Sequence, residues 1–147
     1  MFGRHFVWRY LTAGFIVAAA ANVLSAKQAP ANESLAEKVS PLFQTALPNV
    51  EGKTFTSVIV EFPPAARAAP HRHGAAFVYA YVLAGTLRSQ LDDEPIRTYR
   101  EGESWFEPPG AHHVLTENPS ATESAKLLVI FISKTGDALK VDDPQPK

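Results

Sequence analysis

The sequence predicts an all-β protein, an antiparallel barrel or jelly roll that follows an N-terminal signal peptide. From residue 53 onward, short segments rich in Val, Ile, Phe and Tyr recur about every 8–12 residues, separated by turns that contain Gly or Pro. The chain has 147 residues and 12 prolines, which argues against an all-helical fold. It has no cysteine, so disulfide bonds and thiolate metal sites are excluded and the domain must be stabilised by its core.

The N-terminal residues have the pattern of a secretory signal peptide. Arg4 and Arg9 precede an uncharged apolar stretch, residues 11–24, and small residues follow at Ser25 and Ala26. This order is typical of export signals and predicts cleavage after Ala26. The alternative is an uncleaved anchor, although about 14 apolar residues are fewer than the roughly 20 that span a bilayer. We therefore expect a periplasmic or secreted protein with no stable membrane insertion after cleavage.

Size and composition predict a single domain between two polar segments. Residues 1–26 form the signal peptide, and the Pro- and Ala-containing residues 27–34 are typical of a linker. Residues 35–135 are assigned to the barrel, which is one domain by the usual size of domains. Residues 136–147 are predicted to be a polar C-terminal tail that is loosely held.

The strands follow from side-chain alternation and from the turns that bound them. Residues 34–48 are ambiguous, because Pro41 interrupts the helical spacing of their apolar residues and a strand is equally possible. Residues 63–70 form a loop stiffened by three prolines, and the continuous apolar run at 125–133 indicates a strand buried on both faces. The other predicted strands are 53–62, 77–83, 86–91, 96–100, 105–107 and 112–117.

The charge balance excludes several classes of partner. Lys and Arg number 14 and Asp and Glu number 15, which gives a formal net charge of −1. A nucleic-acid-binding domain needs a clear excess of basic residues to neutralise phosphates. The sequence also lacks a nucleophile elbow and a phosphate-binding loop. We therefore expect a small-molecule substrate and no nucleic acid.

Four of the five histidines form two tight groups, His71 with His73 and His112 with His113. Residues i and i+2 of a strand point to the same face, so His71 and His73 would present their imidazoles side by side. Adjacent residues face opposite ways, so only one of His112 and His113 should point inward. Neutral imidazoles suit Zn, Cu, Fe and Ni, and three ligands leave positions open for substrate. Ordinary surface or core histidines remain the alternative at this point.

The residues around these histidines resemble the two motifs of the cupin family. The second cupin motif is matched, in order, by Gly102, Pro108, Gly110 and His113. The first motif is matched by His71, His73 and an apolar strand that ends at Gly85. Together, residues 60–132 are similar to a single-domain bacterial cupin.

The resemblance implies a small jelly-roll barrel, usually dimeric, that binds a divalent metal inside. It implies that His71, His73 and His113 are the metal ligands, and that the matching glycines and proline have structural roles in turns. The identity of the ion is left open among Fe, Mn, Ni, Cu and Zn. We expect a homodimer.

The chain departs from the cupin pattern at three places. Ala65 stands where the first motif opens with glycine. Glu117 stands where the second motif closes with asparagine, and Asn118 comes one residue late. We expect both of these departures to be structural. The third departure removes a metal ligand. The glutamate that binds the metal in the family would fall at Phe77 or Val78, and neither side chain can coordinate a metal.

The missing glutamate leaves several functions open. A neutral three-histidine site resembles the cupin dioxygenases without a carboxylate ligand, and predicts an oxidoreductase acting on a small oxygen-bearing molecule. A close alternative is an isomerase or lyase that uses the metal as a Lewis acid. A weakened site would instead leave a non-catalytic binding protein, because this barrel hosts many functions.

Three further side chains are candidates for the site. Glu107 can supply a substitute carboxylate or act as a general base, although a solvated strand position is the simpler interpretation. Tyr79 can line the barrel as a catalytic group, although strand packing explains it as well. Arg67 lies in the loop near the mouth and can attract an anion. A barrel plugged by aromatic residues would favour a binding protein, and an open polar cavity would favour an enzyme.

Overall fold

Two antiparallel sheets form the described part of the chain, residues 36–144 of the computed structural model. These residues contain eleven strands and no helix, and therefore no helix able to cross a membrane. The first sheet has the order β1 (Lys38–Ala46), β2 (Lys53–Phe62), β10 (Ala125–Lys134), β5 (Phe77–Ala84) and β8 (Ser104–Glu107). The second has the order β11 (Val141–Asp142), β4 (His71–Arg72), β9 (His112–Glu117), β6 (Thr86–Leu91) and β7 (Arg97–Arg100), with β3 (Arg67–Ala68) also on β9.

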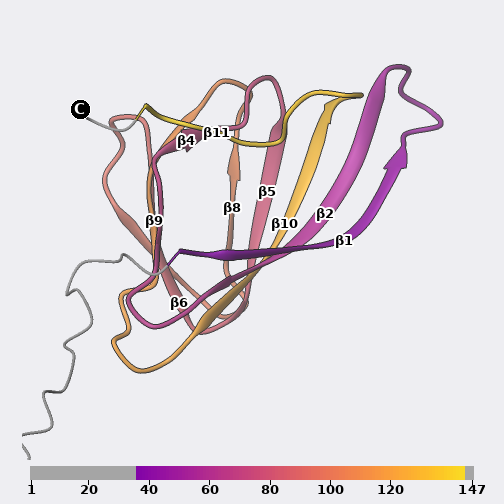
Figure 1. Cartoon of the computed structure of the whole chain (residues 1–147). Coiled ribbons are helices and arrows are strands. Elements are labelled where there is room, and N and C mark those ends of the chain that lie inside the picture. The colour runs from indigo at the N-terminus through magenta and orange to yellow at the C-terminus, as the bar shows by residue number, and fades with distance from the viewer. Residues whose placement is uncertain (1–35, 145–147) are drawn as a thin grey trace, which may run out of the picture. The chain divides into compact units, whose positions relative to one another are not determined.

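The two sheets enclose a single core. Figure 1 shows β9 and its neighbours facing the long strands β2, β10 and β5. The predicted all-β antiparallel fold is confirmed. The predicted signal peptide (1–26) and linker (27–34) lie outside the described residues.

The ambiguous segment near the start of the barrel is a strand. Residues 38–46 form β1, which pairs with β2 only and is therefore an edge strand. Proline is tolerated at an edge because its missing N–H can face away from the ladder. The β1–β2 register shifts between Pro41 and Phe43, which accommodates the proline.

The core is built from alternate residues of the facing strands. Its large members are Val58, Phe62, Val78, Val82, Leu87, Trp105, Leu127, Val129 and Phe131. The prediction that the run 125–133 is buried on both faces is wrong. Only every second residue of β10 is buried, and Leu128, Ile130 and Ile132 lie partly exposed on the other face. A continuous apolar sequence does not reveal whether a second layer covers that face.

The C-terminal segment is part of the barrel rather than a loose tail. Val141 and Asp142 pair with Arg72 and His71 as β11 against β4. The backbone N–H of Asp143 donates to the carbonyl of Pro70 at 2.9 Å. These contacts involve backbone groups in a short polar segment, so hydrophobic patterning gave no indication of them.

Two departures from the cupin motifs have a structural explanation. Asn118 is buried and its side-chain amide donates to the carbonyls of Phe62, Pro63 and Glu123, so it ties loops together as expected. Ala65 has φ of 59°, the left-handed conformation that favours glycine. Its N–H donates to the carbonyl of Ser120 at 2.7 Å, which holds this conformation. Ala65 is therefore strained in a way that the glycine of the motif would not be.

We expect Ala65→Gly to raise the free energy of unfolding by about 0.5–1 kcal/mol, because relief of the left-handed strain outweighs the added entropy of the unfolded chain. Urea unfolding of the full-length chain measures this change. The matched control is Ala121→Gly, in an exposed bend that is not left-handed, which should be slightly destabilising. Equal effects of the two substitutions would contradict the assignment of strain to Ala65.

Candidate metal centre

Three histidines converge inside the barrel. His71 on β4 lies directly opposite His113 on β9, and His73 follows β4 with its ring turned to the same side. One ring nitrogen from each histidine lies within 4.8 Å of those of the others. His71 and His113 are 5% and 4% exposed, so the group is shielded from solvent. His112 points away from this group, and its Nε2 lies 2.7 Å from Asp143 Oδ2. His113 is therefore the inward-facing residue of the His112–His113 pair.

Backbone carbonyls fix the protonation of two of these rings. His71 Nδ1–H donates to the carbonyl of Ala69 at 2.7 Å, and His73 Nδ1–H donates to the carbonyl of Leu139 at 2.5 Å. In a neutral imidazole the other nitrogen then carries a lone pair. The two Nε2 atoms lie 3.1 Å apart, so two acceptors face each other without a proton between them. A cation bound between the two nitrogens would make this approach favourable.

The surroundings keep these two rings neutral. Burial lowers the pKa of His71 to about 4, and the positive charge of Lys140 acts in the same direction. Burial also lowers the pKa of His73, against the opposing effect of Glu107. Neutral imidazole is the form that coordinates metals. Both rings are therefore ready to act as ligands at neutral pH.

Glu107 supplies a carboxylate to the same cluster. It lies on β8 directly opposite Val78, a position where the family glutamate was expected. Its side chain is buried, with Oε1 at 3.1 Å from His113 Nδ1 and Oε2 at 3.6 Å from His73 Nε2. The indole N–H of Trp105 donates to Oε1 at 3.2 Å and orients the carboxylate. Of the two predicted alternatives, a site of three histidines alone and a site with Glu107 as the substitute carboxylate, the geometry favours the second, because the neighbouring strand brings Glu107 to the histidines.

Glu107 is held in its charged form. Burial by itself would raise the pKa of this carboxyl, but its contacts with His113, His73 and Trp105 together lower it. A buried carboxylate needs a positive partner. The lowered pKa values of His71 and His73 mean that these imidazoles do not provide that charge at neutral pH.

The donors present fit a divalent metal ion. Glu107 Oε2 is buried and has no hydrogen-bond partner among residues 36–144, and His113 Nδ1 has only the 3.1 Å contact with Glu107 Oε1. Two nitrogens that share one ion at about 2.1 Å lie roughly 3 Å apart when they are neighbouring ligands. The Nε2 atoms of His71 and His73 have this spacing. An ion would satisfy all four groups, and imidazole with carboxylate is a common donor set for Zn, Fe, Mn and Ni.

Two hydroxyl groups orient His113 and were missed in the sequence. Ser89 Oγ and Thr116 Oγ1 contact His113 Nε2 at 2.8 and 2.7 Å, and both residues are buried. Hydrogen bonds to the second ring nitrogen commonly position a ligand imidazole. Ser and Thr on strands carry no sequence signal for this role.

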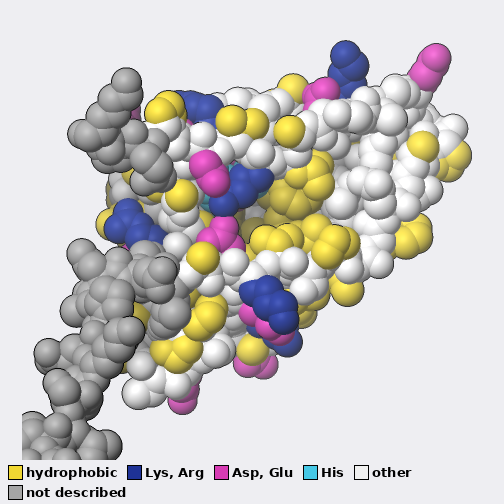
Figure 2. Space-filling view, viewed as in Figure 1, with side chains coloured by type: hydrophobic (Ala, Val, Ile, Leu, Met, Phe, Trp, Pro, Cys, Tyr) yellow, Lys and Arg dark blue, Asp and Glu magenta, His cyan; other side chains and the backbone are white. Residues whose placement is uncertain are grey.

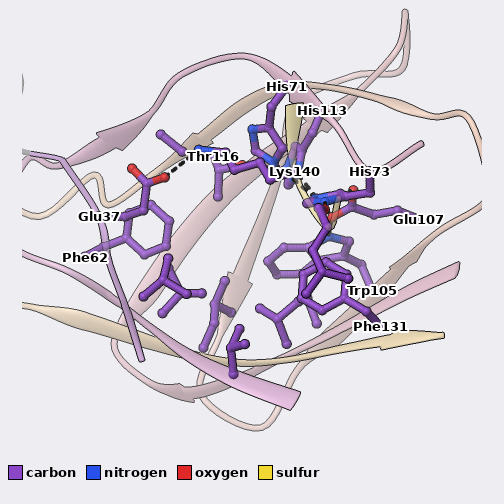
Figure 3. A pocket seen from close by; sticks show the side chains of 18 residues that line it. Glu37, Phe62, His71, His73, Trp105, Glu107, His113, Thr116, Phe131 and Lys140 are labelled. Atoms are coloured by element: carbon purple, nitrogen blue, oxygen red, sulfur yellow. Dashed lines mark hydrogen bonds and ion pairs between the residues drawn. The ribbon is translucent and has the colours of Figure 1, made fainter. Parts of the chain in front are cut away.

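The cluster lies at one end of an apolar cavity of about 140 Å³ (Figure 3). Glu37 and Lys140 line the cavity with the histidines and Glu107. The remaining lining is mostly apolar: Val39, Val58, Val60, Phe62, Ala68, Ala80, Trp105, Thr116, Leu127, Val129, Phe131 and Leu139. The cavity is therefore not plugged by aromatic residues, and its polar groups are concentrated at the histidine cluster and at Glu37 and Lys140.

Tyr79 does not belong to this cavity. Strand β5 points Val78, Ala80 and Val82 inward, so Tyr79 lies on the outer face of the sheet, opposite Phe106. The sequence showed that side chains alternate along β5, but it did not show which of the two alternating sets is buried. Arg67 is exposed and lines a separate depression outside the cavity.

The metal-free protein should lose stability as the pH falls. The unfolded chain binds a proton at His71 with a pKa of about 6.5, and the folded chain only at about 4. The neutral His71 therefore contributes its full stabilisation of the fold above about pH 6.5, and this stabilisation is lost progressively as the pH falls toward about 4. From His71 alone, we expect the free energy of unfolding to fall by about 2 kcal/mol between roughly pH 7.5 and pH 5.

Urea unfolding of EDTA-treated protein at the two pH values measures this loss. His71→Asn removes the titrating group and should reduce the pH dependence. A slope unchanged by this substitution, or a gain of stability toward acid, would contradict the assignment.

Comparison with known proteins agrees with this architecture. A model of the cupin domain matches residues 58–131. A cupin domain from Schizosaccharomyces pombe is 17% identical, with a TM-score of 0.56 over 67% of this chain and 62% of that one. An uncharacterised double-stranded beta-helix protein from Klebsiella pneumoniae is 15% identical, with a TM-score of 0.58 over 80% and 90%. Among curated proteins, no sequence matches the chain.

A variant of oxalate decarboxylase from Bacillus subtilis is also similar. It is 26% identical, with a TM-score of 0.51 over 60% of this chain and 24% of that protein. The chain thus spans less than two thirds of the S. pombe protein and about a quarter of the decarboxylase. Because the cupin model covers half of a chain that folds as this barrel, the chain belongs to the cupin family.

Proposed function

We propose that this cupin is a metal-dependent enzyme that acts on a small oxygen-bearing organic molecule. The observation that carries the proposal is the buried convergence of His71, His73, His113 and Glu107 at one end of a cavity. The buried Oε2 atom of Glu107 has no hydrogen-bond partner among residues 36–144, and a bound ion would satisfy it. The similarity to oxalate decarboxylase supports a small-molecule substrate.

The residues of the chain have distinct roles in this proposal. His71, His73, His113 and Glu107 hold the ion, and the carbonyls of Ala69 and Leu139 orient two of the imidazoles. When bound, a divalent ion polarises a substrate oxygen or, if it is redox-active, activates O₂. The apolar walls exclude water and strengthen the electrostatic interactions inside the cavity.

Two reaction classes are compatible with these donors. Dioxygenase-type oxidation was favoured by a neutral three-histidine site, and the carboxylate of Glu107 removes that reason. An isomerase or lyase that uses the ion as a Lewis acid is the second candidate, and the donor set with Glu107 is compatible with it. The identity of the bound metal separates the two classes. Without a metal, the non-catalytic binding role would remain.

We also propose that the protein is exported. The order of basic, apolar and small residues in positions 1–26 supports export to the periplasm or the medium. Fe(II) is readily oxidised in such a location, which favours Zn, Mn, Ni or Cu in the site.

The composition of the outer sheet face supports a homodimer. Phe77 and Phe106 stack there with ring centroids 5.9 Å apart, and they are 37% and 59% exposed. The cross-strand pairs extend this face through Tyr79 to Ile130. A continuous apolar face of this kind is typical of a protein–protein interface. Tyr79 is therefore proposed as an interface residue rather than a catalytic one.

Elemental mass spectrometry of the purified protein should find about one equivalent of a divalent metal per chain. His73→Ala should lose this metal. Glu107→Gln keeps the shape of the side chain without its charge, and should weaken binding by more than the roughly 10–100-fold typical of an outer-shell partner. His112→Ala is the matched control, because His112 lies outside the cluster and should retain the metal.

The result also decides the reaction class. A redox-active metal such as Fe or Cu would support oxidation, and Zn would support Lewis-acid chemistry. A protein that takes up none of Fe, Mn, Ni, Cu or Zn on reconstitution would contradict the proposed enzyme.

The dimer is tested by light scattering coupled to size-exclusion chromatography. We expect the wild-type chain to be dimeric and Phe106→Glu to be monomeric, because a charge on the apolar face opposes association. Ile96→Glu is the matched control, since Ile96 is 53% exposed but lies outside the five-stranded sheet. A monomeric wild type would contradict the proposed interface.

A further inference from the structure

A half-buried ion pair lies at the mouth of the cavity. Lys140 Nζ binds Glu37 Oε1 at 2.8 Å and Asp142 Oδ1 at 2.9 Å. Figure 3 shows the contact between Lys140 and Glu37 on the side of the cavity away from Trp105. Both residues lie outside residues 58–131, the part of the chain that matches the cupin model. The pair is therefore a feature of this chain that the family motifs do not include.

The ion pair lies between two pockets of the structure. Glu37 and Lys140 line the metal-site cavity, and they also line an outer depression with Arg67 and Asp142. Figure 2 shows basic and acidic side chains gathered beside a hollow on this face of the molecule. A molecule that enters the cavity from the depression must pass Lys140. Arg67, at the rim of the depression, adds a second positive charge on that route.

The two acids that bind Lys140 are not equivalent. The side chain of Asp142 is 53% exposed, so it can keep its contact with Lys140 on the rim. The side chain of Glu37 is only 13% exposed and faces the cavity. Burial alone would lower the pKa of Lys140, but its bonds with Glu37 and Asp142 outweigh burial and raise it. Lys140 is therefore a fixed cation, and Glu37 occupies the place beside it where an external carboxylate could bind.

Among the lining residues within 36–144, Lys140 is the one cation, and its partner Glu37 is the other charged group away from the histidines and Glu107. Between Lys140 and the histidines its described walls are mainly Val58, Val60, Phe62, Leu127, Val129 and Phe131. Its volume is about 140 Å³, close to the roughly 150 Å³ cavity that holds a benzene molecule in another protein. A ligand that complements these features has a compact apolar body and one carboxylate.

We propose that Lys140 is the specificity-determining residue of the cavity and that it selects small monocarboxylates, whose carboxylate replaces Glu37 as its partner. The inference rests on the proposed function, because it names the substrate class of the same cavity. An amide of the same shape cannot replace the charge of Glu37, and it would leave the half-buried ammonium with only the exposed Asp142 as a counter-charge.

The test is isothermal titration calorimetry with butyrate and benzoate, each compared with its primary amide. Metal-free and metal-loaded full-length protein are titrated separately, so that binding of carboxylate to the ion is distinguished from binding to Lys140. The wild type should prefer each acid to its amide in the metal-free form. Lys140→Met should weaken binding of the acids by roughly 10- to 100-fold, the usual effect of losing a charge-assisted hydrogen bond, without changing the amides.

Three variants sharpen the experiment. Glu37→Gln removes the competing carboxylate and should tighten binding of both acids. Lys140→Arg should retain the preference for the acids. Lys126→Met is the matched control, because Lys126 forms a 2.9 Å ion pair with Glu61 on the surface and should not affect binding.

The outcomes separate this inference from the proposed function. Acid binding that is the same in Lys140→Met and in the wild type, or no detectable binding of either acid, would overturn the role of Lys140. The metal content of the same samples reports on the proposed metal site independently. A protein that binds metal but shows no dependence on Lys140 would leave the enzyme proposal intact and refute only this inference.

Discussion

The site depends on the burial of three imidazoles and a carboxylate in a largely apolar interior. Polar groups inside a protein are costly unless each has a partner. Here the backbone satisfies one nitrogen each of His71 and His73, and the remaining lone pairs face each other and Glu107. A positive charge at its centre would stabilise such a cluster. A divalent ion bound there would supply that charge as well as its chemistry.

The position of Glu107 shows how a sheet can supply the same group from a different strand. Val78 and Glu107 are direct cross-strand neighbours, so their side chains lie on the same face of the sheet. A carboxylate on either residue reaches the same histidines. A motif read along the chain detects the loss at position 78 and makes Glu107, 29 positions later, only a candidate replacement. The β5–β8 pairing is what places Glu107 beside Val78.

The C-terminal segment connects the metal ligands with the entrance of the cavity. The carbonyl of Leu139 orients His73, and the next residue, Lys140, carries its charge at the mouth. Pairing of β11 with β4 holds both in place. One short segment therefore positions a ligand and sets the charge that an entering molecule meets. Movement of this segment would affect both functions together.

The sequence by itself determined the all-β class, most strand positions and the three histidines, because these depend on local alternation and on turn residues at fixed spacing. Tertiary structure decided the rest. Which half of the alternation in β5 faces inward, and hence the exclusion of Tyr79, depends on the layer that covers each face. The recruitment of Glu107 and Lys140 depends on strand pairing between distant segments, which leaves no periodic signal in the sequence.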